Sequence, residues 1–145
     1  MSNPPAGDYG LTTLQKAFAV LFGLHGAIHV AGFMVPWRIG DLGADAVYRT
    51  TVMNGALDIG DAGVKAVGLV WLLTAAGMVA VAIALWRQAD WARDGAVVLT
   101  FVSLVLCALG TPEAIGGLLI DAIILPLLVF IPALVVAPSR KLVRR

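Results

Sequence analysis

The segment LQKAFAVLFGLHGAIHVAGFMV, residues 14–35, decides the fold, because it is apolar over the length of a membrane span. A helix needs about 20 mostly apolar residues to cross the hydrocarbon core of a bilayer. The segment nevertheless contains His25 and His29. Ionisable side chains at membrane depth are costly and usually face a bundle interior or a water-filled cavity, so they are candidate functional residues. We therefore interpret the rest of the chain as the surroundings of this histidine pair.

The composition places the whole chain among polytopic membrane proteins. Of its 145 residues, 60% are hydrophobic and 13% are charged, and the mean hydropathy is +0.93. These values lie outside the range of soluble domains. The net charge of +1 excludes the basic surface of a nucleic-acid binder. The single cysteine, Cys107, excludes an intramolecular disulfide and a CxxC metal or redox motif.

Three further segments have the length and composition of spans: residues 66–85, 91–109 and 115–136. The polar leader before residue 14 is followed by an apolar run longer than a signal-peptide core, without a small-x-small cleavage site, so we expect the first span to be retained. The predicted fold is an all-α, antiparallel four-helix transmembrane bundle that forms a single domain over residues 1–145. We expect a multi-pass protein of the cell inner membrane.

The distribution of Lys and Arg predicts the orientation. With both termini in the cytoplasm, seven basic residues lie inside and three outside, which the positive-inside rule favours. The loop of residues 37–65 is then an outer loop. We expect it to be partly helical, with Asp58 or Asp61 as the N-cap of the following helix. The inner residues are Lys16, Arg87, Arg93, Arg140, Lys141, Arg144 and Arg145, and the outer ones are Arg38, Arg49 and Lys65.

The candidate site joins the first and last spans. His25 and His29 are four residues apart and so lie on one helix face. His29 lies roughly 9 Å below the outer end of its helix and His25 roughly 15 Å, from a rise of 1.5 Å per residue. Asp121, in GGLLIDAIILP, lies roughly 9 Å deep on the last span by the same rise. We therefore expect His29 and Asp121 to share a level and to pair if their helices are adjacent.

Other side chains are expected to complete a pocket around these three. Trp71 and Thr74 are three residues apart on the second span and offer an aromatic wall and a hydroxyl. Asp58 and Asp61 can reach the pocket mouth from the outer loop. Thr100 and Ser103 offer hydroxyls from the third span.

Each candidate also has a purely structural interpretation. The histidines can form an interhelical hydrogen-bond network without chemistry, Asp58 and Asp61 can be caps, and Trp71 can be core. Two His at i and i+4 with a carboxylate also match a metal-ligand set, but Gly26 stands where the zincin motif needs Glu. We expect no metal and no other cofactor.

The combination of HGAIHVAGF at residues 25–33, the Pro36-Trp37 stop, the loop motifs YRTT and NGALDIGDAG, and Trp71 resembles small four-helix bacterial integral membrane proteins of uncharacterised function. The resemblance covers most of the chain and implies a four-helix bacterial membrane protein, without an activity. A looser similarity is to the emopamil-binding (EXPERA) group of sterol isomerases, which use intramembrane acidic and His residues beside an aromatic wall. The chain does not reproduce the motifs of that group, so no residue role is carried over.

Three functions fit these observations. The leading hypothesis is that His25, His29 and Asp121 bind a small lipophilic molecule or do acid–base chemistry on it, such as isomerisation, cyclisation or hydration. The alternative is a non-catalytic accessory subunit of a larger membrane complex, and the third is a proton-coupled carrier, which four helices could form only as a homodimer. The bilayer itself is the one partner common to all three.

Overall fold

The computed structural model describes residues 11–40, 47–131 and 135, and these are mostly helical. The prediction of an all-α chain is therefore confirmed. Three helical stretches are long and apolar enough to cross a membrane, which indicates a membrane protein: Thr13–Met34, Gly60–Trp86 and Ala92–Leu109. The helices are α1 (Thr13–Ile28), α2 (Val30–Met34), α3 (Gly60–Trp86), α4 (Ala92–Leu109) and α5 (Ile115–Phe130).

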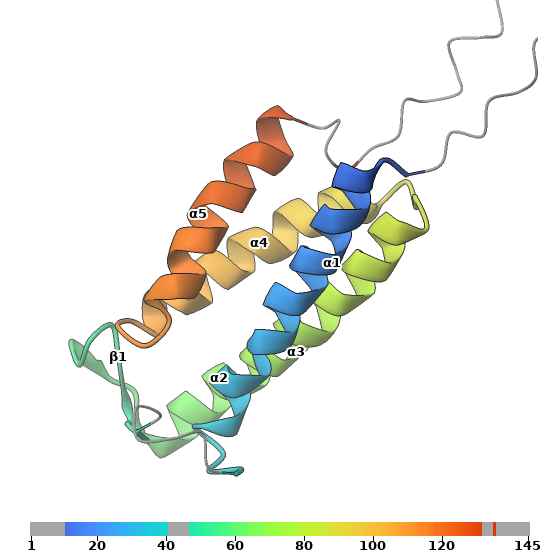
Figure 1. Cartoon of the computed structure of the whole chain (residues 1–145). Coiled ribbons are helices and arrows are strands. Elements are labelled where there is room, and N and C mark those ends of the chain that lie inside the picture. Colours follow the sequence, from blue (N-terminus) through green and yellow to red (C-terminus); the bar gives the residue numbers. More distant parts are fainter. Residues whose placement is uncertain (1–10, 41–46, 132–134, 136–145) are drawn as a thin grey trace, which may run out of the picture.

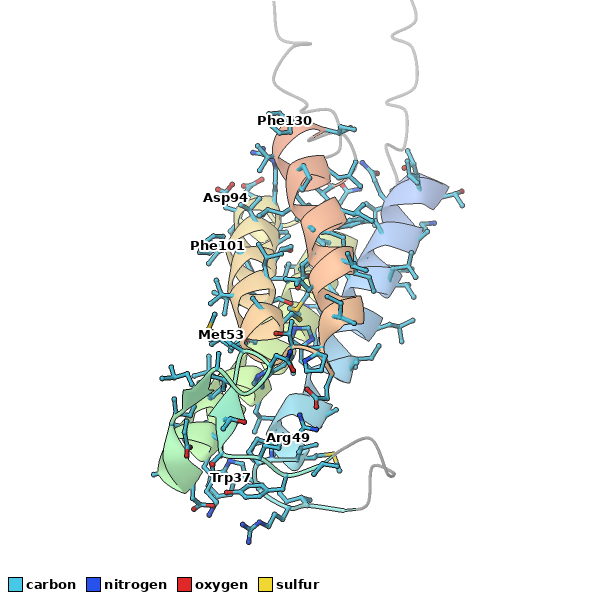
Figure 2. All side chains as sticks on the ribbon, turned by 90° about the vertical axis from the view of Figure 1, so that its left-hand side faces the viewer. Trp37, Arg49, Met53, Asp94, Phe101 and Phe130 are labelled. Atoms are coloured by element: carbon cyan, nitrogen blue, oxygen red, sulfur yellow. The ribbon has the colours of Figure 1, made fainter. Side chains whose placement is uncertain are left out.

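The long helices pack in the order α1, α3, α4, α5, each antiparallel to the next, and α2 continues α1 along α3 (Figure 1). The start of α1 and the end of α5 lie at one end of the bundle. The β-hairpin and the α4–α5 turn lie at the other, which we call the hairpin end. Figure 2 shows Phe101 and Phe130 on the outside, where they are 56% and 80% exposed. Large apolar side chains on the outer surface are what contact with lipid requires.

Local sequence explains where α1 begins and how α5 is held at its end. Thr12 and Gln15 form a capping box, in which each side chain accepts a hydrogen bond from the backbone N–H of the other. Such a box satisfies two of the free N–H groups of a first turn. At the other terminus, the Arg93 guanidinium donates to the carbonyls of Leu128 and Val129, both at 3.3 Å. The last carbonyls of a helix have no partner within it, so Arg93 ties the end of α5 to the start of α4.

Two glycines bring the helices that carry the candidate site close together. A Cβ added to Gly26 of α1 would lie 2.5 Å from the Met78 Cβ of α3, and one added to Gly117 of α5 would lie 2.7 Å from the Cys107 Sγ of α4. Small residues allow such approach between membrane helices. Gly116, the neighbour of Gly117, plays no part in this approach, because nothing lies within 4 Å of a Cβ on Gly116.

The prediction of a partly helical loop over residues 37–65 was wrong for its centre. Strands β1 (Thr51–Val52) and β2 (Leu57–Asp58) form an antiparallel hairpin there, and only the residues from Gly60 onward are helical. The turn residues Met53, Asn54 and Gly55 have φ angles of 53°, 55° and 85°. Asn-Gly is the strongest short signal for such a turn, since both residues tolerate positive φ.

The hairpin is anchored on the α4–α5 turn. The Met53 N–H donates to the Leu109 carbonyl at 2.8 Å, and the Asn54 N–H donates to the Thr111 carbonyl at 2.9 Å. The hairpin thus satisfies a carbonyl at the end of α4.

Several helix ends differ from the predicted ones. The second span begins at Gly60 instead of 66, after Ile59 as N-cap, so neither Asp58 nor Asp61 holds the N-cap position. Asp58 instead accepts a hydrogen bond from the Gly60 N–H at 3.0 Å. The third span agrees to within one residue. The last helix ends at Phe130, whereas most of the predicted continuation to residue 136 lies outside the described residues.

Candidate functional site

A break in the first helix creates the geometry around the histidines. The His29 backbone N–H donates to the Gly26 carbonyl at 3.1 Å, three residues back, where α1 gives way to α2. In a regular α-helix that N–H would use the His25 carbonyl. Here the His29 side chain uses it instead, with Nδ1 at 3.0 Å from that oxygen. The break therefore holds the imidazole of His29 against its own helix.

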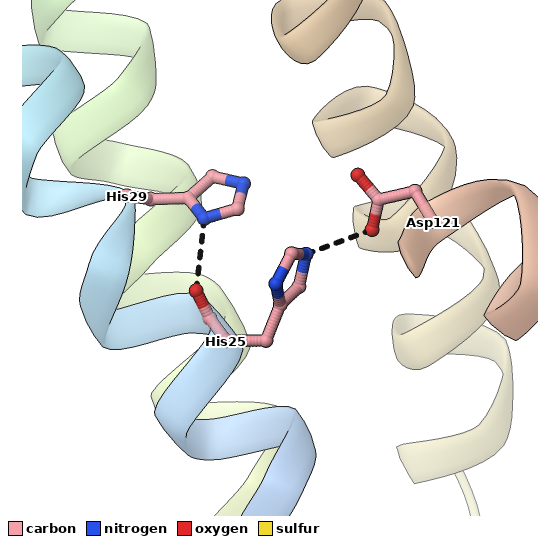
Figure 3. Close-up of side chains that lie close together, drawn as sticks. All are labelled: His25, His29 and Asp121. Carbon is pink, nitrogen blue, oxygen red and sulfur yellow. Dashed lines mark hydrogen bonds and ion pairs between the residues drawn. The ribbon is translucent and has the colours of Figure 1, made fainter. Parts of the chain in front are cut away.

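Four buried side chains from three helices form one hydrogen-bonded chain. His25 Nε2 lies 2.9 Å from Asp121 Oδ1, as Figure 3 shows. Ser103 Oγ is hydrogen-bonded to Asp121 Oδ2, and it lies 2.6 Å from His29 Nε2. Ser103 and Asp121 are fully buried, and the two histidines are 7% and 2% exposed. We call these residues the polar chain: His25, Asp121, Ser103 and His29.

The expected pairing of His29 with Asp121 is corrected in one respect. The structure brings all three predicted residues together, but it is His25 that contacts Asp121 directly, and Ser103 lies between Asp121 and His29. Equal depth in the membrane did not predict which histidine contacts Asp121, because the imidazole of His29 bends back toward the carbonyl of His25. That turn leaves room for Ser103 of α4, the helix on which α5 packs.

Trp71 covers His29 on the side of the hairpin end. Its ring centroid lies 4.9 Å from that of His29, with the planes at 49°. The indole occupies the space a side chain at position 32 would fill, since a Cβ on Gly32 would lie 2.3 Å from Trp71 Cδ2. Gly32 thus places Trp71 over His29.

A cavity of about 550 Å³ lies at the hairpin end and has Trp71 in its wall. Its lining comes from the α1–α2 helix, the hairpin, α3 and the α4–α5 turn. Most of the lining side chains are apolar, including Ile28 and Val67. At its polar edge Arg49 and Glu113, both about half-exposed, form an ion pair at 3.1 Å. A volume in this range and a mostly apolar wall with a few polar groups are typical of small-molecule sites.

The polar chain does not line this cavity, contrary to the expectation of one common chamber. Trp71 is the boundary, because it contacts His29 and also belongs to the cavity wall. Thr74 is also absent from the wall, and its hydroxyl donates to the Val70 carbonyl at 2.8 Å. Thr100 likewise donates to the Ala96 carbonyl.

The two acidic residues expected at the mouth lie outside the cavity lining. Asp61 accepts hydrogen bonds from Lys65, at 2.8 Å, and from Tyr48. Asp58 accepts from the Gly60 N–H and the Thr50 hydroxyl, and these bonds lower the pKa of Asp58. Both carboxylates therefore stabilise the junction of the hairpin with α3 in the described structure.

Three residues of the polar chain, His25, His29 and Asp121, are also the candidates for a metal site. One ligand atom each from His25, His29 and Asp121 lies within 4.8 Å of the others. Imidazole nitrogen and carboxylate oxygen bind several transition metals. An ion would have to replace the hydrogen bond between His25 and Asp121, and its nitrogen ligands would have to be unprotonated. The expectation of no metal and no cofactor stays a prediction.

Ser103, Arg49 and Glu113 are the residues whose importance sequence reasoning missed. The sequence identifies Ser103 only as one of two hydroxyl residues on the third span. Its spacing of four from Cys107, which packs on Gly117, places it on the face of α4 toward α5. Arg49 and Glu113 are far apart in sequence, and only the hairpin brings them together.

Neither a protein-family model, nor a curated protein, nor a solved structure matches this chain.

Proposed function

We propose that this protein binds a small lipophilic molecule in the cavity at the hairpin end. The observation that supports the proposal is the cavity of about 550 Å³, mostly apolar and closed on one side by Trp71. Burial of an apolar body against such a wall gives about 25 cal/mol per Å² of apolar area removed from water.

The polar edge favours a ligand with an uncharged, hydrogen-bonding head group. Arg49 and Glu113 neutralise each other at 3.1 Å, so neither a free cation nor a free anion meets an unbalanced charge there. The guanidinium still has N–H groups to donate and the carboxylate has lone pairs to accept. A hydroxyl, carbonyl or amide on an apolar skeleton matches this pair.

We place the cavity on the outer side of a cell inner membrane that the chain crosses as an antiparallel four-helix bundle, with both termini in the cytoplasm. Lys16, Arg87 and Arg93 fall near the end of the bundle that holds the start of α1, and three basic residues fall near the hairpin end. The four basic residues between positions 140 and 145 raise the number of basic residues on the side of the termini to seven against three, and the positive-inside rule then favours a cytoplasmic C-terminus.

A cavity-filling variant tests binding. Val67 of α3 lines the cavity, whereas Val70, on the same helix, is exposed and does not. Val67→Trp fills the cavity, and Val70→Trp adds the same side chain to the outer surface as a matched control. Native mass spectrometry after gentle detergent extraction should show a bound lipophile on the wild type and on Val70→Trp, with at least tenfold lower occupancy on Val67→Trp.

Equal occupancy in all three proteins would count against the cavity as the binding site. A wild-type protein that carries no lipophile and appears within a larger assembly would favour the accessory-subunit function instead.

The contact between Trp71 and His29 favours a second candidate function, acid–base chemistry on the bound molecule. A general acid or base must reach within hydrogen-bond distance of its substrate. Rotation of the Trp71 indole would expose the imidazole of His29 to the cavity and so meet this requirement. Lipid extracts of cells that produce the wild type, His29→Ala or Asp121→Asn protein test this function. Conversion should fall at least 100-fold in both variants, and full conversion by folded variants would refute the catalytic role.

A further inference from the structure

The hydrogen bonds of the polar chain determine how many hydrogens it holds. A backbone carbonyl only accepts, so His29 Nδ1 carries a hydrogen and donates it to the His25 carbonyl. A neutral imidazole has one N–H, which leaves His29 Nε2 as an acceptor unless the ring is protonated. The protonation state of His29 therefore follows from whether its Nε2 donates or accepts a hydrogen bond.

Three contacts link the ring of His25 to Nε2 of His29, and each needs one hydrogen. They are His25 Nε2 to Asp121 Oδ1, Asp121 Oδ2 to Ser103 Oγ, and Ser103 Oγ to His29 Nε2. With His25 donating from Nε2, the first contact is complete. The Ser103 hydroxyl has one hydrogen and two contacts to satisfy. The missing hydrogen must come from His29 or from Asp121.

Two arrangements satisfy all three contacts. In the first, His29 is a cation that donates from Nε2 to Ser103 Oγ, while Ser103 donates to the ionised Asp121. In the second, Asp121 is a neutral acid that donates to Ser103 Oγ, while Ser103 donates to neutral His29. The two differ only by transfer of the Nε2 hydrogen to Oγ as the hydroxyl hydrogen passes to Oδ2. Both hold the same number of hydrogens and, with a neutral His25, have no net charge.

We propose that Ser103 is a proton relay, through which His29 and Asp121 share one proton inside the bundle. Ser103 differs here from Thr74 and Thr100, the other buried hydroxyl residues of the described core, which donate to the carbonyl four residues back. Loss of the shared proton would leave one short buried contact without a hydrogen, and an unmade buried hydrogen bond is costly in an apolar medium. The network therefore retains the proton.

Trp71 packs against His29, and the two ring centroids are 4.9 Å apart. Two other titratable side chains of the described residues lie beside the relay. They are His25, whose Nε2 lies 2.9 Å from Asp121 Oδ1, and Cys107, whose Sγ lies 4.0 Å from Ser103 Oγ. The inference needs no ligand in the cavity and is independent of the proposed function.

Nitrogen NMR of histidine-labelled protein in lipid nanodiscs tests the relay. The chain has two histidines, so four imidazole nitrogens give separable signals. In the wild type we expect protonated Nδ1 of His29 and an Nε2 signal of a protonated or proton-sharing nitrogen. In Ser103→Ala that signal should move to the position of a bare nitrogen, whereas Thr100→Ala, the matched hydroxyl deletion one turn away, should leave it unchanged.

Two results would overturn the relay. One is a wild-type protein with bare Nε2 on His29 and an ionised Asp121 in its carbon spectrum, a measurement that needs no variant to fold. The other is an unchanged Nε2 signal in folded Ser103→Ala.

Discussion

Asp121 is the position at which two substitutions of similar size should have very different effects on the free energy of unfolding. In Asp121→Asn the amide oxygen can accept from His25 Nε2, and the amide nitrogen can donate to Ser103 Oγ, which then donates to His29. The amide thus reproduces the arrangement in which Asp121 is a neutral acid. All three contacts survive, and we expect a loss of no more than about 1 kcal/mol.

The side chain in Asp121→Leu can neither accept nor donate a hydrogen bond. It removes two interhelical hydrogen bonds, each worth about 0.6–1.7 kcal/mol between membrane helices. It also leaves the His25 Nε2–H without its partner, which adds about 1–3 kcal/mol. The sum is a loss of about 2–6 kcal/mol from these two terms.

Steric-trap or denaturant unfolding in bicelles measures both differences. Ile123→Leu, on the exposed surface of α5, is the control for placing Leu on this helix and should be within about 0.5 kcal/mol of the wild type. Equal losses for Asn and Leu would refute the hydrogen-bond reasoning, as would a Leu variant as stable as the wild type.

Two further predictions concern packing and pH. Gly117→Ala should cost about 1–3 kcal/mol in unfolding free energy, because its Cβ would lie 2.7 Å from Cys107 Sγ, whereas Gly116→Ala should be neutral or stabilising. If both variants unfold alike, close packing of α4 and α5 at Gly117 is not what positions Asp121. Asp58 has a lowered pKa because of the Gly60 N–H and the Thr50 hydroxyl, so its stabilising effect is complete above the ordinary carboxyl pKa, about 4, and is lost as pH falls through the lower value. Protease cleavage within residues 47–59 should therefore rise as the pH falls below about 4, and Asp58→Asn should remove that dependence. A rise of equal size in Asp58→Asn would show that another group is responsible.

Much of the helical core follows from sequence because its signals are local. The apolar length of residues 66–85 and 91–109 predicts helices that the structure contains, with ends displaced by six residues at most. The polar residues His25, His29 and Asp121 stand out because lipid would not accept them, and they do lie together.

The remainder could not be predicted because it depends on side-chain direction and on distant segments. A local helix break turns the ring of His29 back toward the carbonyl of His25. As a result His25, and not His29, contacts Asp121 directly. The cavity needs the hairpin to close over the bundle, and the hairpin is anchored by backbone bonds to Leu109 and Thr111, more than 50 residues further along the chain. The Asn54-Gly55 turn is the one local signal that could have predicted the hairpin.

We propose that a lipophilic molecule occupies the cavity beside Trp71, next to a buried polar chain that joins His25 to His29. A density map of the protein purified with its native lipids would show both features in one experiment. We predict an elongated density in the cavity, in contact with the Trp71 ring, with His25 bonded to Asp121 and Ser103 between Asp121 and His29. A cavity filled by the protein's own side chains, with His25 and Asp121 turned away from each other, would contradict it.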